Sequence, residues 1–256
     1  MAASQQQIAD WTETFARDGF VSMPGYLSGE AFDELRDNLA RYIRDVVPRL
    51  PPTHAFFETP GDHATLKQMQ HMQDEDPFFA DLIRRDCFVE LAKSFLGDDV
   101  VTQGAEYFNK PPGLGKATPP HQDGYYFCLV PNQAVTFWIA LDDVDEENGC
   151  LRYVRGSHRD GVRPHGASQV LGFSQGLQDW GPADEERETM CILKPGDVLA
   201  HHPLTVHRAD ANTSARSRRA MGLVYFAAGA QVDPAAQQRY QESLTQQHAG
   251  MGIGRS

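Results

Sequence analysis

The sequence predicts a mainly β protein, an antiparallel sandwich or barrel flanked by N-terminal helices. Apolar residues recur at helical spacing through the first hundred residues, and short β-rich runs separated by turn residues follow from residue 98. Regularly spaced short strands without intervening helices are typical of sandwiches and barrels. The 256 residues contain no internal repeat and no low-complexity linker, so we expect a single domain over residues 1–256.

The helical part is expected over about residues 1–97, with a short strand at Phe20–Met23. Gly19 and Gly97 stand where helices would end, because glycine readily adopts the left-handed C-cap conformation. Ser28 is the expected N-cap of the longest helix, and Asp76-Pro77 opens a later one by a cap-then-proline signal. The apolar stripes expected to face the core are Ile8, Trp11 and Phe15; Phe32, Leu35, Leu39, Tyr42, Ile43 and Val46; Phe78, Phe79, Leu82 and Ile83; and Leu91 to Leu96.

The β-rich core is expected over about residues 98–227, and a last polar helix over about residues 233–247. Residues 162–187 are polar and glycine-rich, which predicts a long loop, and such loops are often lids over functional sites. The expected strands are Val100 to Phe108, Tyr125 to Val130, Ala134 to Val144, Cys150 to Val154, Thr189 to Leu193, Val198 to His201 and Met221 to Ala227.

Composition limits the partners of the chain. The formal net charge of −12 argues against a nucleic-acid partner, which would require a basic face, but it does not exclude a small anion in a cationic pocket. The four cysteines form no C-x-x-C pair, which indicates a reduced intracellular protein. We find no signal peptide and no apolar run long enough to span a membrane, so we expect a cytoplasmic protein without a membrane partner. The oligomeric state cannot be predicted from these features.

The histidines offer candidate metal ligands. A mononuclear iron site needs two imidazoles and one carboxylate on one face, and His-x-Asp on a strand supplies two of these ligands. Of two such tripeptides, His121-Gln-Asp123 runs into an expected strand, whereas His158-Arg-Asp160 lies in an expected turn. The third ligand must come from a distant strand, where His201, His202 and His207 are the candidates.

A series of motifs extends over roughly residues 60 to 227. It consists of Lys67-Gln-Met-Gln with Phe78, Asn109-Lys-Pro-Pro, His121-Gln-Asp-Gly-Tyr-Tyr-Phe127, Trp138, Asn148-Gly-Cys-Leu151, Gly156-Ser-His158, Pro164-His165, His207 with Asn212, and Arg218-Arg-Ala220. Together these motifs resemble the phytanoyl-CoA dioxygenase family. The resemblance implies a non-haem Fe(II) and 2-oxoglutarate-dependent oxygenase with a double-stranded β-helix (jelly-roll or cupin-like) core buttressed by the N-terminal helices.

The resemblance implies that His121, Asp123 and His207 bind Fe(II) and are the catalytic centre. Three coordination positions would then be free for a chelating keto acid and O2. His201 and His202 become supporting or structural residues. Because Asp123 is present where halogenating relatives have a small residue, hydroxylation is the expected reaction, with release of succinate and CO2.

The second carboxylate of 2-oxoglutarate needs a cation, and arginine suits it by its planar fork and permanent charge. By the family spacing, eleven residues after the distal histidine, Arg218 is the match. Arg216 and Arg219 compete for this role, and strand alternation puts Arg216 on the same face and Arg219 on the other. The co-substrate contacts implied by the resemblance are Arg218, Lys67, Trp138 and Asn109.

Two departures from the family pattern leave an alternative open. Ala209 replaces a serine found in relatives, and Glu106 stands where some relatives have an apolar residue. A β-helix protein that binds a metal or ligand without oxygenase turnover is therefore the second hypothesis. The expected substrate is a small organic metabolite of unidentified structure. Tyr125, Tyr126 and His165 are candidates to face it, although each is more often a packing residue.

A rival motif is Gly172-Phe-Ser-Gln-Gly176, which matches the Gly-x-Ser-x-Gly nucleophile elbow of α/β-hydrolases. An elbow needs a buried strand before it and a helix after it, and only Val170-Leu171 is apolar ahead of the motif. We therefore expect the pentapeptide to lie in a loop over the active site. A serine hydrolase that uses Ser174 is the less favoured alternative.

Overall fold

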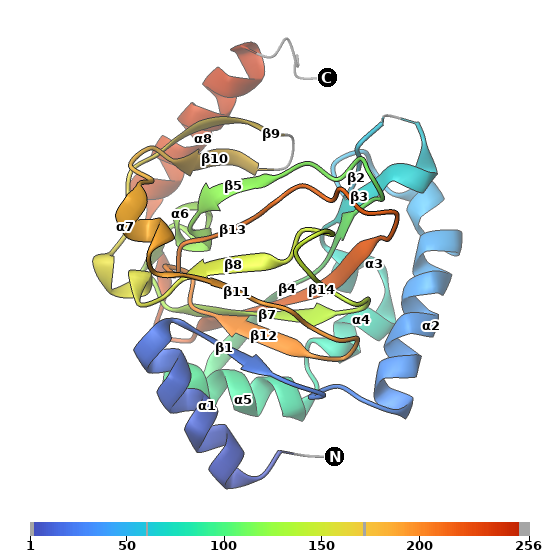
Figure 1. Cartoon of the computed structure of the whole chain (residues 1–256), viewed down its shortest axis with the longest axis horizontal. Coiled ribbons are helices and arrows are strands. Elements are labelled where there is room, and N and C mark those ends of the chain that lie inside the picture. Colours follow the sequence, from blue (N-terminus) through green and yellow to red (C-terminus); the bar gives the residue numbers. More distant parts are fainter. Residues whose placement is uncertain (1–2, 60, 171–172, 251–256) are drawn as a thin grey trace.

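The computed structural model describes residues 3–59, 61–170 and 173–250, and antiparallel sheets with flanking helices confirm the predicted fold class (Figure 1). The α-helices are α1 (Gln5–Asp18), α2 (Glu30–Asp45), α3 (Met72–Glu75), α4 (Pro77–Leu82), α5 (Asp86–Leu96), α6 (Asp123–Phe127), α7 (Pro182–Glu185) and α8 (Pro234–Gly250). Three short 3-10 helices cover Val47–Arg49, His63–Thr65 and Ser157–Asp160.

Two antiparallel sheets form the centre of the molecule. The larger has the strand order β1 (Phe20–Met23), β12 (Val198–His201), β7 (Ala134–Ala140), β14 (Arg218–Ala227), β4 (Val100–Lys110), β3 (Leu66–Met69) and β2 (Ala55–Phe57). The smaller has the order β11 (Glu188–Met190), β8 (Leu151–Val154), β13 (His207–Ala209) and β5 (Thr118–His121). Two strand pairs complete the fold, β9 (His165–Val170) with β10 (Phe173–Leu177) and β6 (Leu129–Val130) with β15 (Gln231–Val232).

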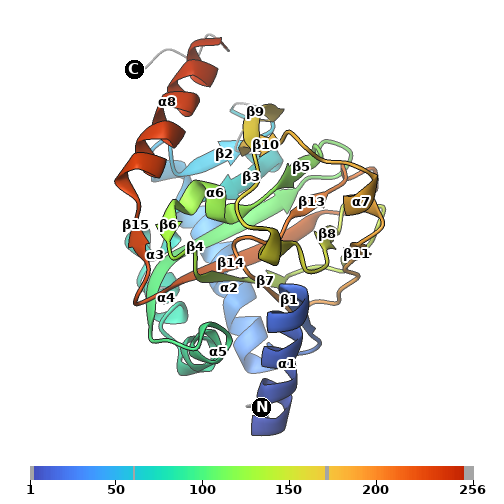
Figure 2. The ribbon, with the colours of Figure 1, turned by 90° about the vertical axis from the view of Figure 1, so that its left-hand side faces the viewer.

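The apolar core is divided between the two faces of the larger sheet. Helices α1, α2 and α5 cover one face, where buried side chains such as Phe15, Leu35, Phe88 and Phe137 pack together (Figures 1 and 2). On the other face a smaller cluster, which includes Tyr153, joins the two sheets. The helical half therefore supports the larger sheet from outside and leaves the space between the sheets for a site.

The predicted helix boundaries are largely confirmed. Gly19 ends α1 in a left-handed conformation with φ 84°, and Asp76 caps α4 by accepting a hydrogen bond from the Phe78 N–H. Ser28 is not the N-cap of α2, because Gly29 occupies that position and makes no side-chain cap. The part predicted as helical also contributes β2 and β3, which extend the larger sheet beyond β4.

Two other predictions are wrong. The run Tyr125 to Val130 is not a strand, since α6 occupies residues 123–127 and only Leu129–Val130 pairs as β6. The Gly124 N–H donates to the Pro203 carbonyl oxygen at 2.8 Å, a tertiary contact that starts a helical turn among residues of high β propensity. Residues 162–187 hold the β9–β10 pair and α7 rather than an irregular loop.

The C-terminal helix α8 lies at the end of the molecule opposite α1, beside α6 and the β9–β10 pair (Figure 2). Its bounds, Pro234–Gly250, agree with the predicted helix over about residues 233–247. Among the described residues, no helix is long and apolar enough to cross a membrane.

Candidate active site

Three candidate metal ligands meet between the sheets. His121 is the last residue of β5, Asp123 is the first residue of α6, and His207 is the first residue of β13. Pairing of β13 with β5 places His207 directly opposite His121. Their ligand atoms lie within 4.8 Å of one another, and each histidine Nε2 is 3.5 or 3.6 Å from Asp123 Oδ1. The first two ligands share a face because the chain turns into α6 between them, not by strand alternation.

Backbone carbonyls fix both histidine rings. His121 Nδ1 lies 2.8 Å from the Pro119 carbonyl oxygen, and His207 Nδ1 lies 3.0 Å from that of Thr205. A carbonyl can only accept, so each Nδ1 carries the proton and each Nε2 presents a lone pair towards Asp123. This is the arrangement in which histidines bind metal ions, and two imidazoles with one carboxylate suit divalent iron. The residues present therefore fit a bound Fe(II).

The charge states also suit a metal centre. Burial and the nearby His121 hold the pKa of His207 well below its usual value, so the ring is neutral. Burial raises the pKa of Asp123, but electrostatic interaction with the surrounding imidazoles of His207, His121 and His201 lowers it more, to well below its usual value. A neutral imidazole beside an ionised carboxylate is the protonation state that a metal ion requires.

A third histidine holds the other carboxylate oxygen. His201 Nε2 lies 3.0 Å from Asp123 Oδ2, and its Nδ1 lies 2.9 Å from the Tyr153 hydroxyl. Oδ1 is thereby left to face His121 and His207. His202, the other candidate ligand of this strand, lies away from the triad, where its ring approaches those of Phe15 and His158.

The three competing arginines have different surroundings. Arg216 pairs with Asp145 at 2.6 Å, and Arg219 pairs with Asp142 at 2.7 Å. Arg218 is 5% exposed and lies 5.3 Å from the Trp138 ring centre. Within the described ranges no carboxylate lies at ion-pair distance from Arg218, and its Nε has no hydrogen-bond partner. Burial lowers the pKa of Arg218 to about 10, which leaves it charged at neutral pH.

The cavity beside the triad brings all seven predicted site residues together. Lys67 lines it from β3 and pairs with Glu58 at 3.4 Å. The Asn109 amide donates to the Leu66 carbonyl oxygen at 2.7 Å, while its buried Oδ1 has no hydrogen-bond partner within the described part of the chain. The predicted residues that line this first cavity are His121, Asp123, His207, Arg218, Lys67, Trp138 and Asn109. Their individual roles stay predictions.

Lys110 is a residue of this cavity that the sequence reasoning missed. It is 3% exposed, and burial together with the charge of Arg218 lowers its pKa to about 6. Its ammonium nitrogen contacts the Lys116 carbonyl oxygen and lies 3.5 Å from Thr118 Oγ1. Its place in the Asn109-Lys-Pro-Pro motif was the available signal.

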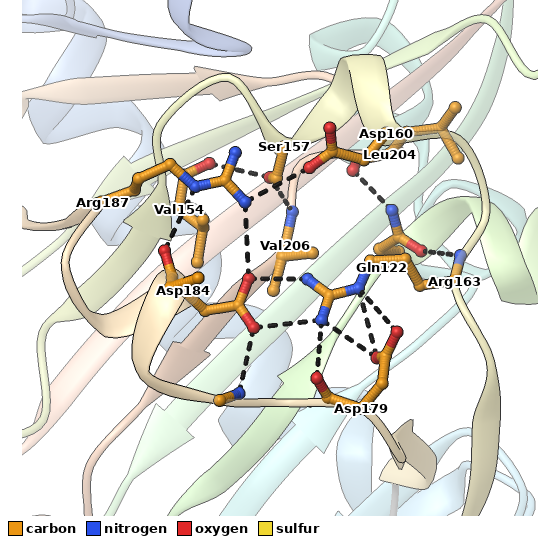
Figure 3. Close-up of polar contacts among 12 residues, drawn as sticks. Gln122, Val154, Ser157, Asp160, Arg163, Asp179, Asp184, Arg187, Leu204 and Val206 are labelled. Atoms are coloured by element: carbon orange, nitrogen blue, oxygen red, sulfur yellow. Dashed lines mark hydrogen bonds and ion pairs between the residues drawn. The ribbon is translucent and has the colours of Figure 1, made fainter.

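A polar network braces the chain on either side of the ligands (Figure 3). Gln122, between two ligands and fully buried, donates to the carbonyl oxygens of Leu204 and Gly161 at 2.7 and 2.9 Å. Its Oε1 accepts from the Arg163 N–H, and the Arg163 guanidinium pairs with Asp184 at 2.7 Å. Segment 157–187 is thus tied to the turn that presents two of the ligands.

The same network reaches the third ligand. The buried Ser157 hydroxyl donates to the Val154 carbonyl oxygen at 2.7 Å and accepts from the Val206 N–H at 2.8 Å, directly before His207 (Figure 3). Gln122 and Ser157 both lie in motifs that resemble the family, His121-Gln-Asp123 and Gly156-Ser-His158, and this was the available signal. Their supporting contacts follow only from the tertiary arrangement.

The remaining candidates divide between packing and the site. Tyr125 stacks on His165 with ring centres 4.3 Å apart, and His165 Nε2 accepts from the Gln122 N–H at 3.1 Å. Tyr126 lines a second cavity beside the triad. The backbone of Ser174 lies in β10, which pairs with β9, so the strand-turn-helix of a nucleophile elbow is absent from the described residues around it. Gly172 lies outside the described residues.

Comparison with known proteins supports the metal-centre interpretation. The family model described as phytanoyl-CoA dioxygenase matches residues 15–220. The peroxisomal phytanoyl-CoA dioxygenase of Mus musculus is 26% identical over 224 residues, which cover 81% of this chain and 64% of that protein. This chain thus spans just under two thirds of the length of the mammalian relatives from mouse, rat and cattle.

Solved structures agree on the fold. EvdO2 from Micromonospora carbonacea var. aurantiaca, complexed with 2-oxoglutarate, is 25% identical with a TM-score of 0.70, over 91% of this chain and 94% of that one. The epimerase SnoN from nogalamycin biosynthesis is 23% identical with a TM-score of 0.72, over 90% of this chain and 88% of that one. Its structure was solved in complex with Fe3+, alpha ketoglutarate and nogalamycin RO.

Proposed function

This chain belongs to the phytanoyl-CoA dioxygenase family, and from that membership we propose that it is an Fe(II)- and 2-oxoglutarate-dependent dioxygenase that hydroxylates a small organic metabolite. His121, Asp123 and His207 would hold Fe(II), since their lone pairs and the carboxylate converge within 4.8 Å. The overall reaction converts substrate, 2-oxoglutarate and O2 to hydroxylated substrate, succinate and CO2.

The observation that carries this proposal is the buried, unpaired guanidinium of Arg218 in the same cavity as the triad. A buried charge without a partner is costly to the fold, and it is usually paired or neutralised. A dicarboxylate with one end at the metal centre would supply the missing partner with its other end. Arginine holds such a carboxylate by two parallel hydrogen bonds.

The other residues of the first cavity have separate tasks. The Trp138 ring lies beside Arg218 and restricts the plane of its guanidinium. Lys67, balanced by Glu58, adds positive potential on the side of β3. His201 holds Asp123 Oδ2, so that Oδ1 faces the metal position. Bound Fe(II) would supply the redox chemistry that activates O2 and couples loss of CO2 to oxygen transfer.

Three features support the co-substrate, hydroxylation and a small substrate. EvdO2, at 25% identity, was solved in complex with 2-oxoglutarate. Asp123 supplies a carboxylate ligand where the family resemblance implies a small residue in halogenating members, which favours hydroxylation. Two cavities adjoin the triad, which gives separate places to the co-substrate and a small substrate.

Succinate formation tests the proposal. The chain loaded with Fe(II) is supplied with 2-oxoglutarate and a metabolite library, and succinate is measured for wild type and for Asp123→Ala. We expect substrate-stimulated succinate from wild type and none from the variant, which lacks a ligand. Binding of 2-oxoglutarate without succinate from any library member would favour the alternative, a binding protein without turnover, to which the departures Ala209 and Glu106 point.

We propose a cytoplasmic location, because the four cysteines form no C-x-x-C pair and suit a reducing compartment, although the mammalian relatives are named peroxisomal. Fractionation of cells that produce the chain tests this: recovery with cytosolic markers is the expected result. Recovery with peroxisomal markers would contradict it.

A further inference from the structure

A second cavity adjoins the triad and differs in charge from the first. The two cavities share Gln68, Phe108, His121, Asp123 and Thr136. The first also contains Lys67, Lys110, Lys116 and Arg218, together with Glu58, which pairs with Lys67. No lysine or arginine is among the described residues that line the second cavity, whereas Glu106 is. A dianion in the first cavity and a second molecule in the second would therefore meet different potentials.

Glu106 lacks a cationic partner. It lies on β4, and across the parts of the chain that the structure describes no lysine, arginine or histidine nitrogen pairs with its carboxylate. Burial and the negative Asp123 raise the pKa of Glu106 to about 7, against a lowering hydrogen bond from Gln68. When a metal ion compensates Asp123, Glu106 remains the uncompensated acid of this cavity.

A buried amide oxygen also indicates a ligand. Gln68 is 4% exposed and lines both cavities, and its Oε1 has no hydrogen-bond partner among the described residues. A buried amide oxygen without a donor is costly, so a bound molecule that donates to it would be favoured. Gln68 Oε1 and the Glu106 carboxylate, which accepts only from Gln68 among the contacts described above, would both be satisfied by a positively charged or hydrogen-donating group.

Aromatic rings form the rest of the wall. Tyr126 and Tyr240 meet edge to face, with ring centres 5.7 Å apart and planes at 83°, and form an aromatic corner. The Tyr126 hydroxyl is already used, since it donates to the Gln175 carbonyl oxygen at 2.6 Å. Ring faces attract cations, and aromatic walls with a nearby carboxylate are the usual means of binding an ammonium group. Phe108 and Phe127 complete the aromatic lining.

We propose that the second cavity binds the primary substrate through a cationic nitrogen, held by Glu106 and the aromatic corner beside the metal position. This inference rests on the proposed function, because it assigns the substrate class of the same site. It makes Glu106, on β4, a specificity-determining residue.

Three probes of nearly equal shape test the charge requirement: choline, its neutral isostere 3,3-dimethylbutan-1-ol, and the anion 3,3-dimethylbutyrate. Their binding to the chain loaded with Fe(II) and 2-oxoglutarate without O2 is measured by calorimetry at about pH 8, above the usual carboxyl range. We expect choline to bind at least about tenfold more tightly than the neutral isostere, a difference of about 1.4 kcal/mol. We expect the anion to bind most weakly.

Variants locate the effect. Glu106→Gln should abolish the preference for choline and leave the affinity for 2-oxoglutarate unchanged, which also shows that the variant is folded. Glu13→Gln, at an exposed position of α1, is the matched control and should keep the preference. Equal binding of choline and its isostere by wild type, or a preference that survives in Glu106→Gln, would overturn the inference.

The two proposals fail separately. If wild type binds no 2-oxoglutarate, the proposed function fails, and the probes are then measured on the chain with Fe(II) alone. A choline preference that depends on Glu106 would still support a cation-binding cavity. Binding of 2-oxoglutarate with no choline preference would overturn only the substrate class.

Discussion

Replacing Arg218 by methionine should separate stability from co-substrate binding. The side chain is 5% exposed, and its charge has no carboxylate partner in the described chain. Methionine keeps much of the apolar stem and removes the charge. The structure therefore predicts opposite effects of one substitution, a more stable fold in the absence of ligand and weaker binding of 2-oxoglutarate.

The magnitudes follow from the burial of Arg218. Its pKa is lowered by burial from 12.5 to about 10. One pKa unit corresponds to about 1.4 kcal/mol, so the charged form is destabilised by about 3 kcal/mol. Because the contact with Trp138 is lost as well, we expect the ligand-free variant to gain about 1–3 kcal/mol in free energy of unfolding. Loss of one partner of a buried charge pair costs about 2–5 kcal/mol, so 2-oxoglutarate should bind thirty-fold to several thousand-fold more weakly.

Two assays measure these effects. Denaturant unfolding gives the stability of the ligand-free chain, and calorimetry with Fe(II) and without O2 gives the affinity for 2-oxoglutarate. Arg219→Met is the control, because Arg219 pairs with Asp142 and is half exposed, and it should keep wild-type affinity. Wild-type affinity in Arg218→Met, or an equal loss in both variants, would refute the assignment of Arg218.

Three further outcomes are expected. His201→Phe should lower Fe(II) affinity about ten- to a hundred-fold, because Asp123 Oδ2 loses its histidine partner and keeps only the long contact with the Thr136 hydroxyl at 3.4 Å; an unchanged metal titration would contradict this. Burial raises the pKa of Asp184, but the Arg163 guanidinium outweighs burial, so the pKa in the folded chain lies below its usual value. The ionised carboxylate therefore stabilises the fold above its unfolded pKa of about 4, and this stabilisation is lost as the pH falls through the folded pKa. Asp184→Asn should therefore lose less thermal stability than wild type between about pH 5 and pH 3, and parallel pH profiles would argue against it. Gly149→Ala should destabilise the fold by about 1–3 kcal/mol, since φ is 82° and a Cβ would lie 2.5 Å from the Asp210 carbonyl oxygen; wild-type unfolding in denaturant would be inconsistent with that strain.

Local signals predicted the helices well. The ends of two helices at Gly19 and Gly97 and the N-cap at Asp76 depend on neighbouring residues only, and the structure confirms each of them. The strand expected over Tyr125 to Val130 is wrong for a long-range reason. A contact between Gly124 and Pro203, residues 79 positions apart in the chain, selects a helical turn that the aromatic composition does not indicate.

The candidate site shows the same division. Spacing indicated His121 and Asp123 and left His201, His202 and His207 as candidates for the third ligand, and the family resemblance implied His207. The structure brings His121, Asp123 and His207 together, but through the turn into α6 rather than through the expected strand. Spacing left Arg216, Arg218 and Arg219 as competitors. The three arginines could be told apart only from the positions of Asp142 and Asp145, which pair with two of them and come from a different part of the chain. The supporting roles of Gln122, Ser157 and Lys110 depend on tertiary contacts that the sequence alone does not specify.

The central claim is that one cavity holds both Fe(II) and 2-oxoglutarate. Its most direct test is the affinity for 2-oxoglutarate, measured without O2 in the presence and absence of Fe(II), for wild type and His207→Ala. We predict that Fe(II) strengthens binding at least about tenfold in wild type, a coupling of about 1.4 kcal/mol, and that the coupling disappears in the variant. No binding of 2-oxoglutarate by wild type, or binding that is indifferent to Fe(II), would contradict the claim.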